Sequence, residues 1–581
     1  MHEMKSAWMF MRFAQSVTIY EMQNALDSGP ISLAGPEDDM NFDSTLSFNI
    51  SRMMNPNRSG AWLSDGPNGP GLGFGTLSLH DAANPSAEAE LCVDQARLSR
   101  TDRKPALALV FGLGLGYHLK ALRRRYPSIR LLVFEPIAEL KSLYENHKIL
   151  SEADGEAPEI YLDWFEFEKQ VSREVVYGRD DSVAVLAPEG YKSLRPEAFG
   201  TFASFIEQEL IRRSVIEKTR ENSAGAFLNN LAVNTGHLAN LPDLLLLKGF
   251  LPSRPAFVVG SGPSLNKNAR DLKGLNNKAL IIAASSALKP LLAWGVSPDL
   301  VLALESEDTS SYLDLTEAEL TVLGDNKILA LASSCHPAHF EVKGFIKAVF
   351  HLTAGAAQIF SRGDFLPQGG NCGSAGFALA YVLGMNPLVL VGQDQAYEGG
   401  RLHADGTPGE VESQSAKNLS VTGLDGRPVE TDTGLLASLG WFIEAARTIA
   451  QKGNPPRLFN CSAGGAEVPG FINMPLATVT ASLPPLNDGF DLAAFSDRLP
   501  RPGQKELSAD LDQLASLVGS LRRLARMDYR KAYVEVHEAG KLSKFLGQIL
   551  AEAAVASGRK ELLASLEKAD ELMTLMRSSL N

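Results

Sequence analysis

A short glycine-rich segment, GSGPSL at 260–265, has the residue types that can bind a phosphate. It directly follows the apolar run at 256–259 and precedes a predicted helix start at 268–272. Amide groups at a helix N-terminus, together with nearby hydroxyls, can hold a phosphate. The alternative is a tight strand-to-helix turn without a ligand. The segment is not a Walker loop, because no Gly-Lys-Ser/Thr follows. The candidate binding residues here are Gly260, Ser261, Gly262, Pro263 and Ser264.

Polar residues also follow three other apolar runs. Ser285 and Ser286 come after ALIIAA, Glu305 and Glu307 after LVLAL, and Gln393 and Asp394 after LVLVG. Polar side chains at the carboxyl ends of parallel strands meet in one crevice, where they can bind ribose hydroxyls or accept a proton. Surface solvation is the alternative, but it suits helix faces better than strand ends.

Two further segments add candidates to this crevice. His403, in GGRLHADG, is the histidine nearest in sequence to Asp394, and it can act as a base or stabilise a phosphate leaving group. Asn371 and Ser374, in QGGNCGSAGFALA, precede a predicted helix and could donate to a ligand. Helix capping is the alternative role for both.

An earlier segment, FGLGLGYHL at 111–119, follows the strand predicted at 106–111. Glu135 ends the next predicted strand, at 129–134. This arrangement imitates a nucleotide-binding βαβ turn, but the glycines are spaced GxGxG and bulky Tyr117 follows. A bound nucleotide and a purely structural βαβ unit both remain possible interpretations.

The elements that must position these residues alternate between strand and helix patterns, which predicts an α/β fold with a largely parallel sheet. Apolar spacing after Pro500, as at Leu511, Leu514 and Leu521, predicts helices over 505–580. We therefore expect a central Rossmann-like parallel-sheet domain between an N-terminal α/β domain and a C-terminal helical domain. The predicted bounds are 1–200 for the N-terminal domain, 201–480 for the central domain, 481–504 for a proline-rich linker and 505–581 for the helical domain.

Composition excludes some partners and sites. The 581-residue chain has a formal charge of −13, which argues against bulk binding to nucleic acid or anionic membranes. Its four scattered cysteines predict neither a zinc site nor a redox dithiol, and they fit a reducing compartment. The longest nearly apolar stretch has about a dozen residues, whereas a membrane span needs about 20. We therefore expect a cytoplasmic protein.

Several segments together resemble the motility-associated factor (Maf) glycosyltransferases, which modify flagellin in bacteria. They include LHDAANPSAEAE, FGLGLGYHL, LVFEP, PAFVVGSGPSLNKNARDLK, QGGNCGSAGFALAYVLGMNPLVLVGQDQAYEGGRLHADG and LFNCSAGGAEVPGFINMPL, and they span most of 80–480 in order. The central part is also similar to bacterial sialyltransferases, which carry a similar Gly-x-Gly-Pro-Ser turn, and to archaeal pterin diphosphokinases.

The resemblance implies a GT-A-like central domain that transfers a nonulosonic acid, such as pseudaminic or legionaminic acid. The donor would be the CMP-activated sugar, and the acceptor a Ser or Thr hydroxyl of flagellin, so the enzyme would serve flagellum assembly and motility. The 260–264 turn would help to bind CMP, and either Asp394 or His403 would be the base. We expect no metal and no cofactor besides the activated sugar.

Two alternatives remain open. A pterin diphosphokinase would transfer diphosphate from ATP and would need magnesium, hence carboxylates such as Glu305, Glu307 and Asp308 near the turn. A non-catalytic flagellin-binding chaperone would use the helical C-terminal segment as an apolar groove.

Overall fold

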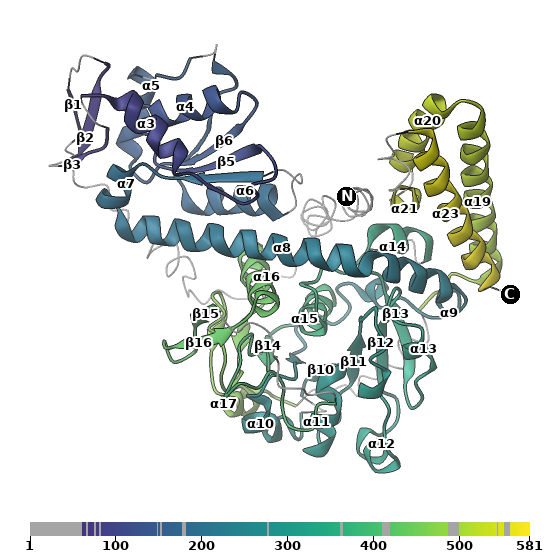
Figure 1. Cartoon of the computed structure of the whole chain (residues 1–581). Coiled ribbons are helices and arrows are strands. Elements are labelled where there is room, and N and C mark those ends of the chain that lie inside the picture. Colours follow the sequence, from purple (N-terminus) through teal and green to yellow (C-terminus); the bar gives the residue numbers. More distant parts are fainter. Residues whose placement is uncertain are drawn as a thin grey trace. The chain divides into compact units, whose positions relative to one another are not determined.

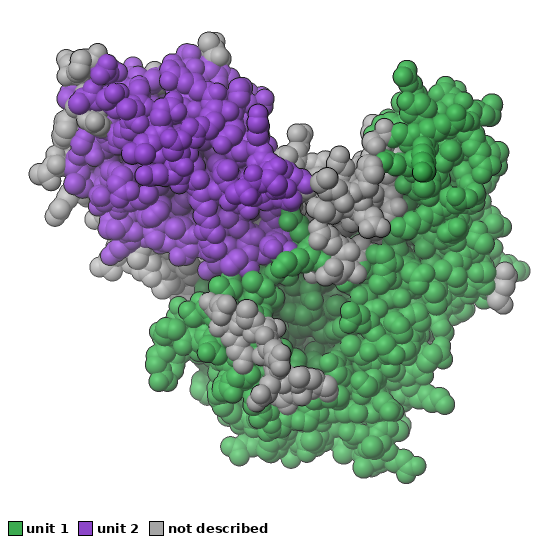
Figure 2. Space-filling model, viewed as in Figure 1, with its two compact units in different colours: residues 1–29, 215–581 green, residues 30–214 purple. Residues whose placement is uncertain are grey.

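The computed structural model describes residues 61–64, 68–74, 77–80, 83–147, 149–151, 154–176, 182–275, 278–360, 364–408, 419–485, 499–542, 544–550 and 558–580. The chain forms two compact units (Figure 2), and each is described separately below. The N-terminal unit comprises the described residues of 30–214, and the C-terminal unit comprises those of 215–581. The division falls within the long helix α8 (Pro196–Val233).

The N-terminal unit is built on a five-stranded sheet in the order β4-β8-β5-β6-β7. β5, β6, β7 and β8 run parallel, and the short edge strand β4 pairs antiparallel with β8. The central strands β5 and β6 are apolar and buried over most of their length, apart from Arg130 at the start of β6, as is typical of a parallel sheet covered by helices. The strands are β4 (Arg97–Leu98), β5 (Pro105–Phe111), β6 (Arg130–Phe134), β7 (Glu159–Tyr161) and β8 (Ser182–Leu186). The helices are α3 (Pro85–Asp94), α4 (Tyr117–Arg125), α5 (Ala138–His147), α6 (Trp164–Val176) and α7 (Glu189–Leu194).

A small antiparallel sheet precedes this one, with the order β1 (Ala61–Ser64), β2 (Gly71–Phe74) and β3 (Leu77–Ser78).

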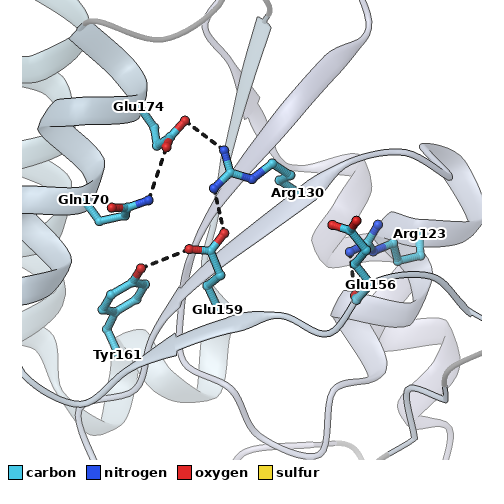
Figure 3. A network of polar contacts seen from close by, with 7 residues as sticks. All are labelled: Arg123, Arg130, Glu156, Glu159, Tyr161, Gln170 and Glu174. Carbon is cyan, nitrogen blue, oxygen red and sulfur yellow. Dashed lines mark hydrogen bonds and ion pairs between the residues drawn. The ribbon is translucent and has the colours of Figure 1, made fainter. Parts of the chain in front are cut away.

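An ion-pair network holds the β6–β7 edge of the five-stranded sheet (Figure 3). Arg130 on β6 donates to Glu159 on β7 at 2.7 Å and to Glu174 on α6 at 2.8 Å. Tyr161 donates to Glu159, and Gln170 donates to Glu174, so Glu159 and Glu174 each have two partners. The network joins β6, β7 and α6 at the sheet edge. It does not involve the carboxyl ends of β5 and β6.

The C-terminal unit contains an eight-stranded, fully parallel sheet in the order β13-β12-β11-β10-β9-β14-β17-β18. The chain starts at β9, builds outward to β13, then returns to the other side of β9 with β14. The topological switch point therefore lies between β9 and β14, where open α/β sheets bind ligands. The strands are β9 (Ala256–Val259), β10 (Leu280–Ala284), β11 (Leu300–Ala303), β12 (Ile328–Ala332), β13 (Ile346–Phe350), β14 (Leu388–Val391), β17 (Leu458–Asn460) and β18 (Ile472–Asn473).

Helix α15 (Cys372–Val382) packs on β9, β10, β11 and β14 (Figure 1). Nine of its residues, Cys372 to Ala380, are all buried, and small side chains such as Gly376 let the helix approach the sheet closely. The remaining elements are α9 (Thr235–Leu238), α10 (Leu265–Asn268), α11 (Leu288–Ala293), α12 (Glu317–Leu323), α13 (Ala338–Glu341), α14 (Ala354–Phe360), β15 (Leu419–Thr422), β16 (Pro428–Thr431), α16 (Thr433–Ala450) and α17 (Leu476–Ser482), with short 3₁₀ turns η2 (Leu244–Leu247), η3 (Ala269–Leu272), η4 (Ser285–Ala287) and η5 (Ser310–Tyr312).

The C-terminal segment is helical, as its apolar spacing predicted. α19 packs against α20 and α23, and α21 packs against α14 beside the sheet. The predicted α/β class, with a parallel sheet and a helical C-terminal region, is confirmed. Of the predicted linker at 481–504, residues 486–498 lie outside the described part of the chain. These helices are α19 (Gln504–Met527), α20 (Tyr529–Leu542), α21 (Lys544–Ile549) and α23 (Arg559–Ser578).

Candidate functional site

The 260–264 turn lies at the switch point, against the carboxyl end of β14. The Gly260 amide donates to Val391 O at 2.9 Å, and the Gly262 amide donates to Gly392 O at 2.8 Å. A Cβ on Gly260 would lie 2.6 Å from Gly392 O, and one on Gly262 would lie 2.6 Å from Asp394 Cγ. The two glycines therefore serve the close approach of the chain to itself at this point.

Asp394 completes the turn. One carboxylate oxygen accepts the Ser264 amide at 2.7 Å, and the other accepts the Ser264 hydroxyl. Burial raises the pKa of Asp394 to about 6, although the two hydrogen bonds from Ser264 favour the charged form. Asp394 is only 4% exposed, and both of its carboxylate oxygens are bound to Ser264. It therefore positions the turn and has little access to an acceptor substrate.

The amides of the turn are largely used within the protein. Those of Gly260, Gly262 and Ser264 have protein acceptors, and helix α10 behind the turn has only four residues. Because the Ser264 hydroxyl is also bound to Asp394, the turn presents the Ser261 hydroxyl to a ligand more than it presents amides. This differs from the phosphate cradle that the sequence pattern alone predicts.

Ser261, Ser286 and His403 form a polar cluster beside the turn. The Ser261 hydroxyl lies 2.8 Å from the Ser286 hydroxyl and 3.0 Å from Nδ1 of His403. The backbone fixes this arrangement, because the Ala404 amide donates to Ser261 O at 2.7 Å. The sequence predicted all three residues as candidates, and the fold brings them together across more than 140 positions. A hydroxyl–imidazole pair of this kind can relay a proton.

Gln393 lies next to this cluster, at the first turn of α15. Its side chain is 5% exposed, and its Nε2 has no hydrogen-bond partner among the described residues. A Cβ on Gly260 or Gly373 would lie within 3 Å of the Gln393 amide group, so the side chain fills the space between the 260–264 turn and the start of α15. A buried donor without a partner costs about 1–3 kcal/mol, so its presence calls for an explanation.

Asn371 and Ser374 both act as caps. Asn371 is the N-cap of α15 and accepts the Ser374 amide at 2.9 Å, while its Nδ2 donates to Ser438 at 2.7 Å. The Ser374 hydroxyl donates to Asn371 O and accepts the Gly369 amide. The amides of Cys372 and Gly373, ahead of Ser374, have no acceptor within the helix by virtue of their position. Of the two predicted roles, the geometry supports capping.

Glu305 and Ser285 face α15 from the other side. The Cys372 thiol donates to Glu305 Oε1 at 3.3 Å, and Glu305 Oε2 accepts the Leu304 amide at 3.0 Å. The Ser285 hydroxyl lies 4.0 Å from the Cys372 sulfur. Burial, and then the charge of Glu305, raise the pKa of Cys372 well above its usual value, so this thiol stays protonated. Glu305 is thus near the first turn of α15 but held by its own neighbours.

The remaining carboxylates named for a magnesium site, Glu307 and Asp308, are exposed, and Asp308 is hydrogen-bonded to Ser310. Among the residues described here, no three histidine, cysteine or acidic side chains are grouped so that they could hold a metal.

The site also uses a residue that sequence analysis did not predict. The Ser462 hydroxyl accepts the backbone amide of Gln393 at 3.0 Å and so fixes the start of the Gln393–Asp394 segment. It follows the strand β17, so the rule that placed the other candidates at strand ends would have found it.

The glycine loop of the N-terminal unit, at 112–116, is filled by three side chains of the same unit. The Leu113 amide donates to Glu135 at 2.8 Å, the Gly114 amide to the Tyr191 hydroxyl at 2.8 Å, and the Leu115 amide to His80 Nε2 at 3.0 Å. A Cβ on Gly112 would lie 2.4 Å from the Tyr191 ring. Since these groups occupy the amides that would bind a phosphate, the geometry supports the structural interpretation of this βαβ unit.

Glu135 is the counterpart of Asp394 in this loop. It is fully buried, and it accepts the Ile137 amide and the Tyr191 hydroxyl as well as the Leu113 amide. Burial raises its pKa to about 7, against the lowering effect of Tyr191 and the backbone donors.

Comparison with known proteins gives two kinds of relative. The family described as "6-hydroxymethylpterin diphosphokinase MptE-like" matches residues 226–400. A 6-hydroxymethyl-7,8-dihydropterin pyrophosphokinase from Methanocaldococcus jannaschii is 30% identical over 90 residues, which are 15% of this chain and 36% of that protein. The chain thus matches about a third of the length of this curated relative.

Among solved structures, the Maf glycosyltransferase from Magnetospirillum magneticum AMB-1 aligns over 92% of both chains, with 16% identity and a TM-score of 0.49. Both kinds of relative expected from the sequence motifs are therefore found. Across the described helices, none combines the length and the apolar character needed to cross a bilayer.

Proposed function

We propose that this chain is a glycosyltransferase that moves a nonulosonic acid, of pseudaminic or legionaminic type, from a CMP-sugar to a Ser or Thr hydroxyl of flagellin. The reaction would take place in the cytoplasm and serve flagellum assembly. Support comes from the Maf-like motifs spread over 80–480 and from the chemistry of the residues around the switch point.

The observation that carries the proposal is the side-chain Nε2 of Gln393 at the N-terminus of α15, which has no hydrogen-bond partner among the described residues. In CMP-sugar transfer, negative charge grows on the departing phosphate, and the protein must supply donors to it. Gln393 Nε2 and the amides of Cys372 and Gly373, which have no acceptor within α15, are such donors, and the dipole of an 11-residue helix adds to them. The phosphate of CMP would lie there, beside the hydroxyl of Ser261 in the 260–264 turn.

His403 is the better candidate for the base of the two that the sequence left open. Asp394 is buried and engaged by Ser264, whereas His403 is partly exposed and contacts the hydroxyl of Ser261. In the proposed reaction His403 takes the acceptor hydroxyl proton as the new glycosidic bond forms. The sugar–phosphate bond breaks through an oxocarbenium-like transition state, and the electron pair leaves with CMP.

Incubating flagellin with the CMP-sugar tests the whole assignment. Intact-mass spectrometry should show a mass increase of one or more nonulosonic acid residues, and His403→Ala should lower the rate by about 10²–10⁴-fold. Ser520→Ala is a matched control, because Ser520 is exposed on α19 and its hydrogen bonds to described residues, Ser516 and Arg523, stay within that helix. An unmodified flagellin mass with both CMP-linked sugars would contradict the proposal.

A second candidate is supported by the match at 226–400. A pterin diphosphokinase would transfer diphosphate from ATP with magnesium, at the same switch point. Thermal shift of the full chain separates the two candidates. Stabilisation by CMP without magnesium supports the glycosyltransferase, and stabilisation by ATP with magnesium alone supports the kinase.

A further inference from the structure

One end of the C-terminal helical bundle carries the two most exposed large apolar side chains of the described chain. Met527, the last residue of α19, is 83% exposed, and Val534 on α20 is 59% exposed. Tyr529, the first residue of α20, is also exposed. Apolar residues scattered singly over a surface are ordinary, but three such residues gathered at one corner between two helices need a physical reason. The proposed transfer reaction uses none of them.

Six cations surround these apolar groups. Helices α19 and α23 pack antiparallel, and Arg522 near the end of α19 binds Glu567 and Asp570 on α23 (Figure 1). Residues 523–535 and 559–561 therefore lie at the same end of the bundle, where they supply six cations and three carboxylates. All six cations are exposed, and none forms an ion pair with a described residue. They are Arg523, Arg526, Arg530, Lys531, Arg559 and Lys560.

The charge of this end is opposite to that of the chain as a whole, which has a formal charge of −13. At physiological ionic strength, electrostatic interactions between exposed charges are screened over about 8 Å. A surface that approaches this end therefore interacts mainly with the local cations. Their excess over the carboxylates selects an anionic partner.

The placing of the apolar groups favours a lipid surface over a protein or an RNA. A stable protein interface covers about 800 Å² on each partner around an apolar centre, whereas Met527 stands between Arg526 and Asp528. One partly exposed tyrosine is a poor platform for stacked RNA bases. A lipid surface needs no complementary shape, because cations contact its phosphates and a protruding apolar side chain enters between its headgroups.

From these observations we propose that this end of the helical bundle docks on an anionic lipid bilayer, with Met527 inserted among the headgroups. The six cations lie beside the lipid phosphates, and Tyr529 lies at the boundary between water and lipid, where tyrosine is favoured. Docking is reversible, because one inserted side chain buries little apolar area. The proposal does not depend on the transfer reaction proposed above.

Sedimentation of the full chain with lipid vesicles tests the proposal. The chain should sediment with vesicles that contain about one-third phosphatidylglycerol and stay in solution with vesicles of phosphatidylcholine alone. Raising the salt concentration from about 0.1 M to about 0.5 M should weaken binding at least tenfold, because the cations are then screened. Equal sedimentation with both vesicles, or none with either, would overturn the proposal.

Two variants with a matched control show whether this end makes the contact. Arg526→Glu with Arg530→Glu should weaken binding to phosphatidylglycerol vesicles about tenfold or more, since two attractions become repulsions. Lys273→Glu with Lys343→Glu makes the same change in total charge at two exposed lysines outside the bundle, and it should leave binding unchanged. Met527→Ser should weaken binding several-fold without altering its salt dependence. Equal binding by the two double variants would show that the contact lies elsewhere.

Polyuridylate and polyglutamate test the other two kinds of partner. Both are anionic but present no headgroups for Met527 to enter, so each should bind more weakly than vesicles of the same anionic charge. Tighter binding of either polymer than of the vesicles, lost in Arg526→Glu with Arg530→Glu, would replace the lipid with an RNA or an acidic protein.

Discussion

The two glycine-rich strand-to-helix turns of this chain have the same internal support but different chemistry. In each, a carboxylate at the end of the neighbouring parallel strand accepts a turn amide: Glu135 accepts that of Leu113, and Asp394 accepts that of Ser264. Burial raises the pKa of both carboxyls. In a glycine turn of this kind, amides that could bind a phosphate already donate to a carboxylate of the protein. The glycines alone therefore do not indicate a phosphate site.

The two turns differ in the side chains around them. In the N-terminal loop, Tyr191 accepts the Gly114 amide and His80 accepts the Leu115 amide, so these side chains seal the loop. The 260–264 turn instead borders the hydroxyls of Ser261 and Ser286, the ring of His403 and Gln393 Nε2, for which the described part of the chain offers no partner. Only the second turn therefore keeps polar groups that a ligand can use.

The largest expected effect is on the sealed loop. Gly112→Ala places a Cβ within 2.4 Å of the Tyr191 ring at a φ of +94°, so it should destabilise the N-terminal unit by more than about 3 kcal/mol. Hydrogen exchange measured by mass spectrometry over peptides of β5 and β6 checks this. Gly200→Ala, in helix α8 with nothing within 4 Å, should instead stabilise by about 0.5–1 kcal/mol. Equal exchange in the Gly112 variant and the wild type would mean that Tyr191 does not seal the loop.

The pH dependence of stability should reveal the buried carboxyl of Glu135. Its folded pKa, about 7, lies above the ordinary value of 4.5, so the folded state holds the proton more tightly. That contribution is fully present below pH 4.5 and is lost as pH rises through 7, by about 3 kcal/mol in all. Glu135→Gln should flatten this slope, which denaturant unfolding followed by exchange in the same peptides would detect. An unchanged slope would show that Glu135 is ionised throughout.

Ser261→Ala should lower the stability less than the changes above, and it should also weaken CMP binding. The hydroxyl is bonded to Ser286 and His403, so its loss should lower the free energy of unfolding by about 0.5–1.5 kcal/mol. It should weaken CMP binding several-fold by calorimetry, because a donor beside the phosphate is removed. The matching change in the sealed loop, Tyr117→Phe, removes a hydroxyl bonded to Pro70 O and should leave CMP binding unaltered. If both variants bound CMP like the wild type, the contrast between the turns would fail.

Much of this arrangement could be predicted from local sequence. Continuous apolar runs such as those of β5, β9 and β10 predict buried parallel strands, and the rule that ligands bind at strand ends placed Gln393, Ser286 and Glu305 near one edge. His403 and Asp394 were also placed correctly beside the turn.

The closure of each turn could not be predicted, because it depends on contacts between distant residues. Asp394 lies 130 positions from Ser264, and Tyr191 lies 77 positions from Gly114. Asp394 reaches the 260–264 turn only because β14 lies next to β9 in the sheet. The periodicity of apolar residues carries no information about this strand order. For the same reason, the sequence could not separate the positioning role of Asp394 from that of a base.

The central claim is that Gln393 Nε2, which has no hydrogen-bond partner among the described residues, is kept there because it binds the phosphate of the CMP-sugar. Calorimetric titration of CMP into Gln393→Leu, with the unfolding free energy measured alongside, tests this most directly. The account predicts that the variant is at least as stable as the wild type, because a buried unpaired donor is removed, while CMP binds about tenfold or more weakly. A folded Gln393→Leu variant that binds CMP as tightly as the wild type would contradict it.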